Sequence, residues 1–304
     1  MAAEAEPPHP AGWIDLHAHT DESDGSLTPA ELVALARETG LDALAITDHD
    51  TLLGYEKARA PAAEAGIDLV CGIELNTRMS LDTALRQRSV HLLAYFLSGQ
   101  PGSEFATWLE GERIERQSRN ERLAQTLRKR GIDITVEEVE QRGRSLAGRP
   151  HFARILVEKG YAQHSEEAFV RYLGETAPSF VPRDSQSAEE VISIVRSAGG
   201  APVIAHPIRL NLPRHAEREL LLRYRDAGLA GLEVYHSEHP PELQAHYRQL
   251  AEELGLLPTG GSDFHGAIKP DIQLGTGRDG NVRVPTTFIE ALRAAFPGVG
   301  PRPI

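Results

Sequence analysis

The segment WIDLHAHT (residues 13–20) has the apolar pattern of a short buried strand and carries two histidines, His17 and His19. Alternate residues of a strand point to the same face, so both imidazoles face one way. An aspartate follows at Asp24, in a Ser-Asp-Gly turn. Two imidazoles with a carboxylate near the end of a strand are typical of half a divalent-metal site. The alternative is a hydrogen-bonded pair of core histidines, with Asp24 as an ordinary turn residue.

Five further segments with the pattern of a buried strand also bring a histidine or an acidic residue. They are residues 43–47, 68–73, 89–95, 201–205 and 256–262, and they supply His49, Glu74, His91, His206, Asp263 and His265. A seventh strand is expected over residues 230–235. Helical patterns alternate with these strands, and this predicts a parallel α/β sheet. In a parallel α/β barrel, catalytic residues gather at the C-terminal ends of the strands, where we expect these side chains.

Residues 101–184 break the alternation of strands and helices. They contain no clear strand pattern, one long charged helix over 104–130, and shorter helices near 135–142, 150–159 and 165–173. We interpret this segment as a helical insertion in a barrel made of residues 12–100 and 185–304. Either it is a packing module, or it is a lid over a binding site. The acidic, proline-rich residues 1–11 are interpreted as a disordered tail.

Composition limits the partners and the compartment. The 304 residues carry a net charge of −12, which argues against stable binding to duplex nucleic acid. No apolar run reaches the roughly 18 residues that span a bilayer, and we expect no membrane partner. One cysteine, Cys71, excludes an intrachain disulfide and favours a cytoplasmic protein. Its apolar strand predicts that Cys71 is a core residue.

An ordered set of short motifs resembles the PHP (polymerase and histidinol phosphatase) family. In chain order they are DLHAHTDESDG (15–25), ITDHD (46–50), GIE (72–74), His91, AHP (205–207) and SDFH (262–265). Three further pieces resemble stand-alone PHP phosphoesterases, which include 3′,5′-nucleotide bisphosphate phosphatases and 5′→3′ exoribonucleases. These are GRPHFARILVEKGY (148–161), FVPR (180–183) and AEEVISIVRSAGGAPVIAHP (188–207). The resemblance implies an α/β fold, a distorted (β/α)7-type barrel with an inserted helical subdomain.

The resemblance also implies two or three divalent metal ions. His17, His19, Glu74 and Asp263 would surround the first ion. Glu74 would bridge to a second ion held by His91 and His206, and Asp24, His49 and His265 would hold a third. Imidazole and carboxylate ligands without thiolate suit manganese, our first choice, or iron, zinc or magnesium. A metal-bound hydroxide would then attack phosphorus, with no covalent intermediate.

Other residues are assigned to substrate or to support of the ligands. Arg149, Arg183 and Arg209 are the candidates for phosphate binding, with surface ion pairs as the alternative. Asp263, His206 and His236 are the candidate catalytic residues, with His236 as the candidate proton donor to the leaving oxygen. Asp15, Asp48 and Asp50 are expected to orient ligands or form turns. Five other histidines are expected at the surface: His9, His164, His215, His239 and His246.

The leading functional hypothesis is hydrolysis of a phosphate monoester of a nucleotide, such as a 3′,5′-bisphosphate, or of the 5′ end of a short oligonucleotide. Three alternatives remain open. The first is histidinol-phosphate phosphatase. The second is a metal-dependent C–N hydrolase, because amidohydrolase barrels also carry H-x-H on a first strand. The third is a non-catalytic, metal-stabilised module like those of some polymerases.

Overall fold

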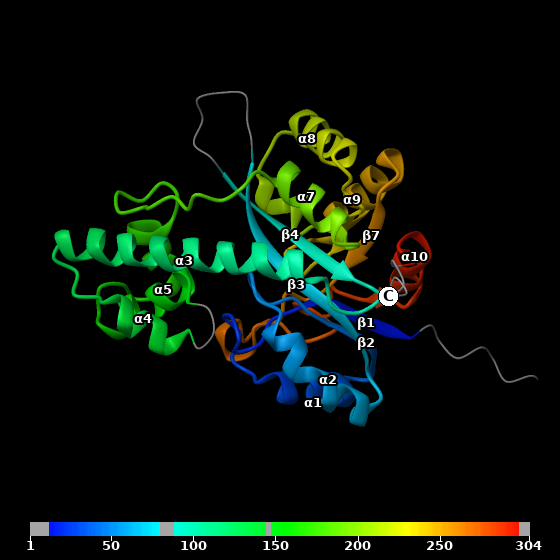
Figure 1. The fold of residues 1–304 in the computed structure, drawn as a ribbon, viewed down its shortest axis with the longest axis horizontal. Coiled ribbons are helices and arrows are strands. Elements are labelled where there is room, and N and C mark those ends of the chain that lie inside the picture. Colours follow the sequence, from blue (N-terminus) through cyan, green and yellow to red (C-terminus); the bar gives the residue numbers. More distant parts are fainter. Residues whose placement is uncertain (1–11, 80–87, 144–146, 298–304) are drawn as a thin grey trace, which may run out of the picture.

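The computed structural model describes residues 12–79, 88–143 and 147–297, and its fold is a distorted, nearly closed α/β barrel (Figure 1). The expected tail over 1–11 lies outside the described residues. All seven expected strands are present, and a short eighth strand pairs antiparallel with the first. In sheet order the strands are β7 (Leu257–Gly260), β6 (Gly231–Tyr235), β5 (Ala201–Ile204), β4 (Arg88–Phe96), β3 (Asp68–Met79), β2 (Leu41–Ile46), β1 (Trp13–Ala18) and β8 (Val284–Pro285).

The chain after β7 lies against β1 and draws the two ends of the sheet together. The amide of Asp263 donates to the carbonyl of His17 at 2.8 Å, and the amide of His19 donates to the carbonyl of Phe264 at 2.9 Å. Gly261 permits this approach, because a Cβ there would lie 2.3 Å from the His17 nitrogen. Two segments that are about 240 residues apart in the chain, and that both carry candidate ligands, therefore meet side by side.

Strand β4 corrects one expectation about where the ligands sit. Strands β1 to β3 run parallel, as do β5 to β7, but β4 is antiparallel to both of its neighbours. His91 therefore lies near the start of its strand, opposite Asn76 of β3, and not near the C-terminal end. Because the strand direction is reversed, its beginning lies at the same end of the barrel as the ends of the parallel strands.

Helices cover the outside of the sheet (Figure 1). Helices α1 and α7 begin at the capping boxes of Thr28 and Ser187, whose side chains accept from the third helical amide. The helix α10 was not expected from the sequence. The helices around the barrel are α1 (Pro29–Thr39), α2 (Leu53–Ala65), α7 (Ala188–Ser197), α8 (Arg214–Asp226), α9 (Pro241–Leu254), α10 (Thr287–Ala295) and the 3-10 turns η2 (Pro207–Leu210) and η3 (Gly266–Ile268).

The helices expected between residues 101 and 184 form a group with its own apolar core. Phe105 and Leu109, in the first turns of α3, pack into the barrel core, whereas Leu127 packs with Phe152 and Ile155 in a separate cluster. Figure 1 shows α3 extending away from the sheet above α4 and α5. The elements are α3 (Ser103–Lys129), α4 (Val136–Arg142), α5 (Arg149–Glu158), α6 (Ser165–Ala168) and the π-helical turn η1 (Phe169–Leu173).

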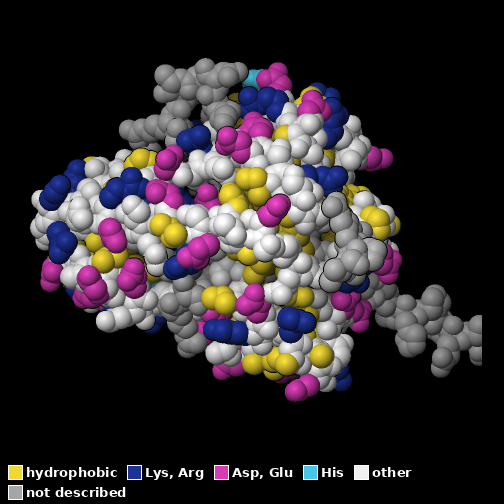
Figure 2. Space-filling model, in the orientation of Figure 1, with side chains coloured by type: hydrophobic (Ala, Val, Ile, Leu, Met, Phe, Trp, Pro, Cys, Tyr) yellow, Lys and Arg dark blue, Asp and Glu magenta, His cyan; other side chains and the backbone are white. Residues whose placement is uncertain are grey.

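The surface in Figure 2 shows basic and acidic side chains interspersed over the whole face. Among the residues described, no helix combines the length and the apolar character that crossing a membrane requires. Cys71 is buried in β3, as expected, and burial raises the pKa of its thiol to about 12.

Candidate metal centre and active-site cleft

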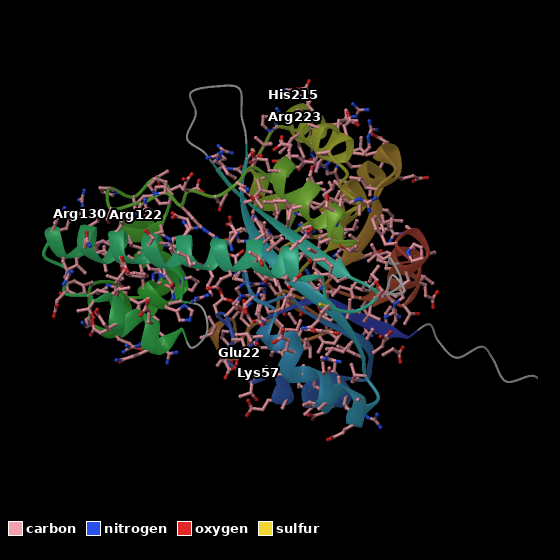
Figure 3. All side chains as sticks on the ribbon, viewed as in Figure 1. Glu22, Lys57, Arg122, Arg130, His215 and Arg223 are labelled. Carbon is pink, nitrogen blue, oxygen red and sulfur yellow. The ribbon has the colours of Figure 1, made fainter. Side chains whose placement is uncertain are left out.

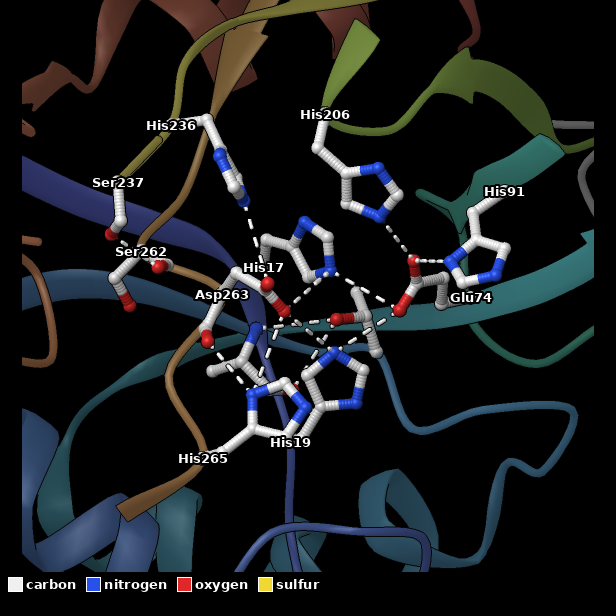
Figure 4. A network of polar contacts seen from close by, with 12 residues as sticks. His17, His19, Glu74, His91, His206, His236, Ser237, Ser262, Asp263 and His265 are labelled. Atoms are coloured by element: carbon white, nitrogen blue, oxygen red, sulfur yellow. Dashed lines mark hydrogen bonds and ion pairs between the residues drawn. The ribbon is translucent and has the colours of Figure 1, made fainter. Parts of the chain in front are cut away.

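Glu74 lies at the middle of the candidate site. Its side chain is 1% exposed, and both oxygens face imidazoles (Figure 4). Oε1 lies 2.7 Å from His91 Nδ1 and 2.9 Å from His206 Nε2. Oε2 lies within 3.3 Å of a nitrogen of each of three further histidines, His17, His19 and His49. One carboxylate therefore joins side chains from β1, β4 and the ends of β2 and β5.

Asp263 lies on the other side of the two β1 histidines. Its Oδ1 is 3.5 Å from His17 Nε2 and 3.3 Å from His19 Nε2. Its Oδ2 accepts from Lys269 Nζ at 2.8 Å and from Arg209 Nη2 at 3.1 Å. The two imidazoles thus point the same way, as the strand periodicity predicts, into a space between two buried carboxylates.

Asp24 lies close to three histidines: His19, His49 and His265. Its Oδ1 lies 3.5 Å from His19 Nδ1 and 3.4 Å from His265 Nε2, and its Oδ2 lies 3.7 Å from His49 Nε2. Ligand atoms within 4.8 Å of one another form three groups: His17, His19, Glu74 and Asp263; His19, Asp24 and His265; and His49, Glu74 and His91. The first group is the expected one, whereas the structure places His49 nearer to Glu74 and brings His19 to Asp24.

The hydrogen bonding of His19 fits a metal ligand. Its ring is fully buried, yet within the described part of the chain neither ring nitrogen has a hydrogen-bond partner. Its Nε2 instead faces two carboxylates, at 3.1 Å from Glu74 Oε2 and 3.3 Å from Asp263 Oδ1, an arrangement that suits ligands around a shared cation. Although burial lowers it, the pKa of His19 is raised to about 9 by its contacts with Asp263 and Glu74. A divalent ion would replace that proton.

Two of the candidate ligands, Glu74 and His49, are in the ionisation states that metal binding requires. Burial alone would raise the pKa of Glu74, but its interactions with His49, His91 and His17 lower this pKa well below the usual range of a glutamate. Burial lowers the pKa of His49 to about 3, despite the opposing charges of Glu74 and Asp24. The carboxylate is therefore ionised and the imidazole neutral at pH 7, which are the forms that bind a cation.

Three buried acidic residues hold the ligand-bearing segments in place. Asp15 accepts from the amides of His17 at 3.1 Å and Ser262 at 2.9 Å. Asp48 accepts from the amide and hydroxyl of Thr20 and from Ser23, and so holds the loop that carries Asp24. Glu233, which the sequence analysis missed, contacts His17 Nδ1 at 2.9 Å and accepts from the amide of His206 at 2.5 Å. The sequence did contain an indication of this role, because Glu233 is the lone acidic residue in the apolar segment GLEVY (231–235).

Three residues at the site have backbone torsions that are uncommon for side chains other than glycine. The φ angles are 49° at Asp50, 29° at His206 and 57° at Asp263. Such torsions persist when surrounding contacts over-determine them, and they concentrate at functional sites. Here the turns at the ends of β2, β5 and β7 hold these side chains at the barrel mouth.

A cleft of about 1580 Å³ opens over the ligand cluster and extends under the helical insertion. Arg149, Arg183 and Arg209 all line it, together with Asp24, His49 and Glu74. Arg209 contacts Asp263 and also pairs with Glu238 at 2.6 Å. Arg183 pairs with Asp50 at 2.7 Å and with Glu112 at 2.7 Å. Arg149 lies with its guanidinium 5.9 Å from the centre of the Phe180 ring.

Two histidines differ from what the sequence suggested. His236 is fully buried and faces Asp263 Oδ2 at 3.4 Å, but it is not among the residues that line the cleft. The surface position expected for His239 is wrong. It is fully buried, its Nδ1 lies 2.8 Å from the carbonyl of Val234, and its ring packs on Tyr247. His215 is exposed (Figure 3), as is His164, and His246 is partly exposed, while His9 lies outside the described residues.

The basic residues at the cleft that were not singled out from the sequence include Lys269, Arg116 and Arg119. Lys269 binds Asp263, and Arg116 binds Asp50. Arg116 and Arg119 occupy positions on the buried face of α3 that continue through Leu123 and Leu127. The helical periodicity of the sequence therefore indicated these two residues, because it places two arginines at positions where apolar residues are expected.

Comparison with known proteins agrees with this fold and site. A model of the PHP domain matches residues 15–175. The 5′-3′ exoribonuclease of Haemophilus influenzae is 31% identical over 252 residues, which cover 83% of this chain and 89% of the relative. The 3′,5′-nucleoside bisphosphate phosphatase of Chromobacterium violaceum is 32% identical over 255 residues, which cover 83% of this chain and 87% of the relative.

A solved structure supports the same relationship. A protein of Bifidobacterium adolescentis, named as a metal-dependent phosphoesterase, has 32% sequence identity and a TM-score of 0.80, over 96% of this chain and 98% of that chain. The likeness thus extends over the barrel and the helical insertion alike. The family match spans more than half of the chain and the relatives align with most of it, so the protein belongs to the PHP domain family and is a metal-dependent phosphoric ester hydrolase.

Proposed function

We propose that the protein hydrolyses phosphate monoesters of nucleotides, either 3′,5′-bisphosphates or the 5′ ends of short oligonucleotides. The observation that carries this proposal is one cleft lined both by candidate metal ligands and by arginines. Cations of both kinds suit a dianionic phosphate, because arginine binds phosphate oxygens in pairs. The names of the relatives, an exoribonuclease and a nucleoside bisphosphate phosphatase, support a nucleotide as substrate.

We assign two or three divalent ions to the site, with manganese as the expected metal. When bound, such ions activate a water molecule and neutralise charge on the phosphoryl group. The mixture of imidazole and carboxylate donors without thiolate supports manganese, iron, zinc or magnesium. The residues assigned to the ions are His17, His19, Asp24, His49, Glu74, His91, His206, Asp263 and His265.

Within this proposal, Asp263 and His206 carry the catalytic roles, and His236 supports them. Asp263 and His206 contact the ligand cluster directly. His236 contacts Asp263 and does not line the cleft, so its role becomes one of positioning that carboxylate instead of donating a proton to the leaving oxygen. Arg149, Arg183 and Arg209 bind the phosphate groups of the substrate.

We also propose that residues 101–184 act as a lid on the barrel. Support comes from the cleft, which is lined by Arg149 at the start of α5 and Phe169 of η1 as well as by the barrel residues Glu74 and Asp263. A cytoplasmic location follows as an expectation from the single, buried Cys71.

The test is a substrate screen of the purified chain loaded with Mn²⁺. The panel contains adenosine 3′,5′-bisphosphate, 5′-phosphorylated oligoribonucleotides, histidinol phosphate and an amide. We expect phosphate release from the nucleotides and loss of turnover in His17→Ala, with Glu217→Gln as a control at a buried carboxylate of α8. A preference for histidinol phosphate or the amide over every nucleotide would overturn the substrate assignment. A wild-type protein without any turnover would favour a non-catalytic module.

A further inference from the structure

His151 is the third residue of α5, is 9% exposed and lines the cleft. Its Nδ1 accepts a hydrogen bond from the amide of Gly148 at 3.1 Å. A ring nitrogen that accepts carries no proton, so the other nitrogen, Nε2, is the N–H donor of the neutral ring. Within the described part of the chain, Nε2 has no hydrogen-bond partner and is not fully buried. His151 therefore presents an N–H donor to the cleft.

The backbone turn that orients His151 is held against α3. Asn120 of that helix is 1% exposed, and its Nδ2 donates to the carbonyl of Ala147 at 3.0 Å. The next residue, Gly148, packs on Arg116, because a Cβ there would lie 2.9 Å from Arg116 Nη1. The amide that bonds to the imidazole is therefore fixed by its surroundings. This arrangement preorganises the direction of the Nε2–H donor.

His151 lies between the metal-ligand cluster and Arg116 of α3. Burial lowers the pKa of its ring, the charge of Asp24 opposes this effect, and the charge of Arg116 adds to it. Both charges thus act on the ring, one from the cluster and one from the insertion. Arg116 in turn binds Asp50, whose amide donates to the carbonyl of Glu74 at 2.9 Å. The lowered pKa keeps the ring neutral at pH 7, in agreement with the accepting Nδ1.

The leaving oxygen of a phosphate ester benefits from a donor at this place. His236, the donor expected from the sequence, is not among the residues that line the cleft. Lys269 and Arg209 line it, but both bind Asp263 Oδ2. Negative charge builds on the leaving oxygen as the P–O bond breaks, and a fixed, neutral N–H stabilises such charge without giving up its proton. His151 offers an N–H of this kind.

We propose that His151 is a catalytic residue whose neutral Nε2–H donates a hydrogen bond to the leaving oxygen of the scissile ester. This rests on the proposed function, in which the scissile phosphate lies at the Glu74 cluster. In the reaction, the oxygen of water forms a new bond to phosphorus, and water gives up a proton. The ester P–O bond breaks, its electron pair stays on the leaving oxygen, and that oxygen takes a proton from solvent. The Nε2–H bond stays intact, so Nδ1 keeps its hydrogen bond to Gly148 throughout.

Replacement of the bridging atom of the substrate tests the contact. His151→Gln removes the imidazole N–H and leaves a residue type that caps helices from this position. The metal-loaded enzyme is given adenosine 3′,5′-bisphosphate, or its analogue with sulfur as the bridging atom of the cleaved ester, because a thiolate leaves without a donor. We expect kcat for the bisphosphate to fall by roughly 10²- to 10³-fold, kcat for the sulfur analogue to fall by less than about 10-fold, and KM to stay unchanged. An equal fall for both compounds, an unchanged kcat, or a change in KM alone would overturn the proposal.

His164→Gln is the matched control. His164 also caps a helix through Nδ1, which accepts from the amide of Glu167 at 3.3 Å, but it is exposed and is not among the residues that line the cleft. Its replacement should change neither kcat nor KM for either compound. If His164→Gln slowed the bisphosphate as much as His151→Gln does, the loss would come from helix capping, and the proposal would fail. His151→Phe, which has no N–H at all, should show the same difference between the oxygen and sulfur compounds as His151→Gln.

A tautomer measurement needs no turnover and separates this inference from the proposed function. Nitrogen NMR of the zinc-loaded chain, assigned by comparison with His151→Gln, should show a neutral His151 ring at pH 7 with its proton on Nε2. A proton on Nδ1 would overturn the inference whatever the substrate is.

The two proposals can also fail separately in the kinetics. If wild type hydrolyses other phosphate esters and no nucleotide, the proposed substrate is wrong, and p-nitrophenyl phosphate and benzyl phosphate become the test pair. His151→Gln should then slow hydrolysis of the benzyl ester more, because benzyl alcohol is the poorer leaving group. An equal effect on both esters would reject the role of His151, and a wild type without any phosphatase activity would reject both proposals.

Discussion

His17 and Glu233 form a fully buried contact in which Nδ1 of the imidazole lies 2.9 Å from Oε1 of the carboxylate. The other oxygen of Glu233 accepts from the amide of His206 at 2.5 Å. One carboxylate on β6 thus orients two candidate ligands from β1 and the end of β5. Partners of this kind fix the tautomer and the direction of a metal-binding histidine.

Replacing Glu233 by glutamine should weaken metal binding without unfolding the protein. The amide keeps the shape of the side chain but loses the charge that holds His17 Nδ1 as a donor, and the expected loss of Mn²⁺ affinity is about 10- to 100-fold. Calorimetric titration of the metal-free chain measures it. Glu217→Gln removes another buried carboxylate, on α8, and should leave the affinity unchanged. Equal Mn²⁺ affinity in Glu233→Gln and wild type would contradict the orienting role.

Metal binding should release protons at neutral pH. Burial lowers the pKa of His19, but Asp263 and Glu74 outweigh it and raise the pKa to about 9 in the metal-free chain. Below that pKa the imidazole carries a proton that a metal must displace, so Mn²⁺ affinity should rise with pH up to about 9. Titrations at pH 7 in two buffers of different ionisation enthalpy reveal the proton release. Identical heats in both buffers would show that metal binding displaces no proton from His19.

Arg149→Ala should weaken turnover of nucleotide phosphates by roughly 10²-fold, as expected for the loss of a preorganised donor to the phosphate. Metal content should stay the same, because Arg149 contacts the carbonyl of Leu173 and the ring of Phe180 and none of the ligand candidates. Steady-state kinetics and metal analysis check both statements. Arg171→Ala serves as the control, since Arg171 is exposed and pairs with Glu167. Full activity of Arg149→Ala would make Arg149 a structural residue of the insertion.

Gly261→Ala should destabilise the barrel where the chain after β7 meets β1. An added Cβ would lie 2.3 Å from the His17 nitrogen and 2.4 Å from its Cβ, so one of the two segments must move. Overpacking of this kind costs about 1–3 kcal/mol of unfolding free energy. Gly111→Ala in α3 is the matched control: an added Cβ meets nothing within 4 Å, and a gain of roughly 0.5–1 kcal/mol is expected. Denaturant unfolding of both variants measures the difference, and equal stability would contradict the close approach.

Local patterns in the sequence were enough for the elements and for most of the candidate ligands. Capping at Thr28 and Ser187, the apolar strand segments and the long helix of residues 104–130 all appear as expected. The two-residue period of β1 places His17 and His19 on one face, where both meet Glu74. These features depend on hydrogen bonds and side-chain directions within a few residues, so neighbouring letters of the sequence contain them.

Which of these side chains share a space was decided by tertiary structure. The reversed direction of β4 brings His91 to Glu74 from the start of its strand, and the packing of α9 buries His239. The position of Arg119 on a buried helical face is readable in the sequence, but its lack of a counter-ion is not. Burial and charge pairing depend on contacts between segments far apart in the chain. Local periodicity gives the face of an element, and only the pairing of strands and the packing of helices determine what that face meets.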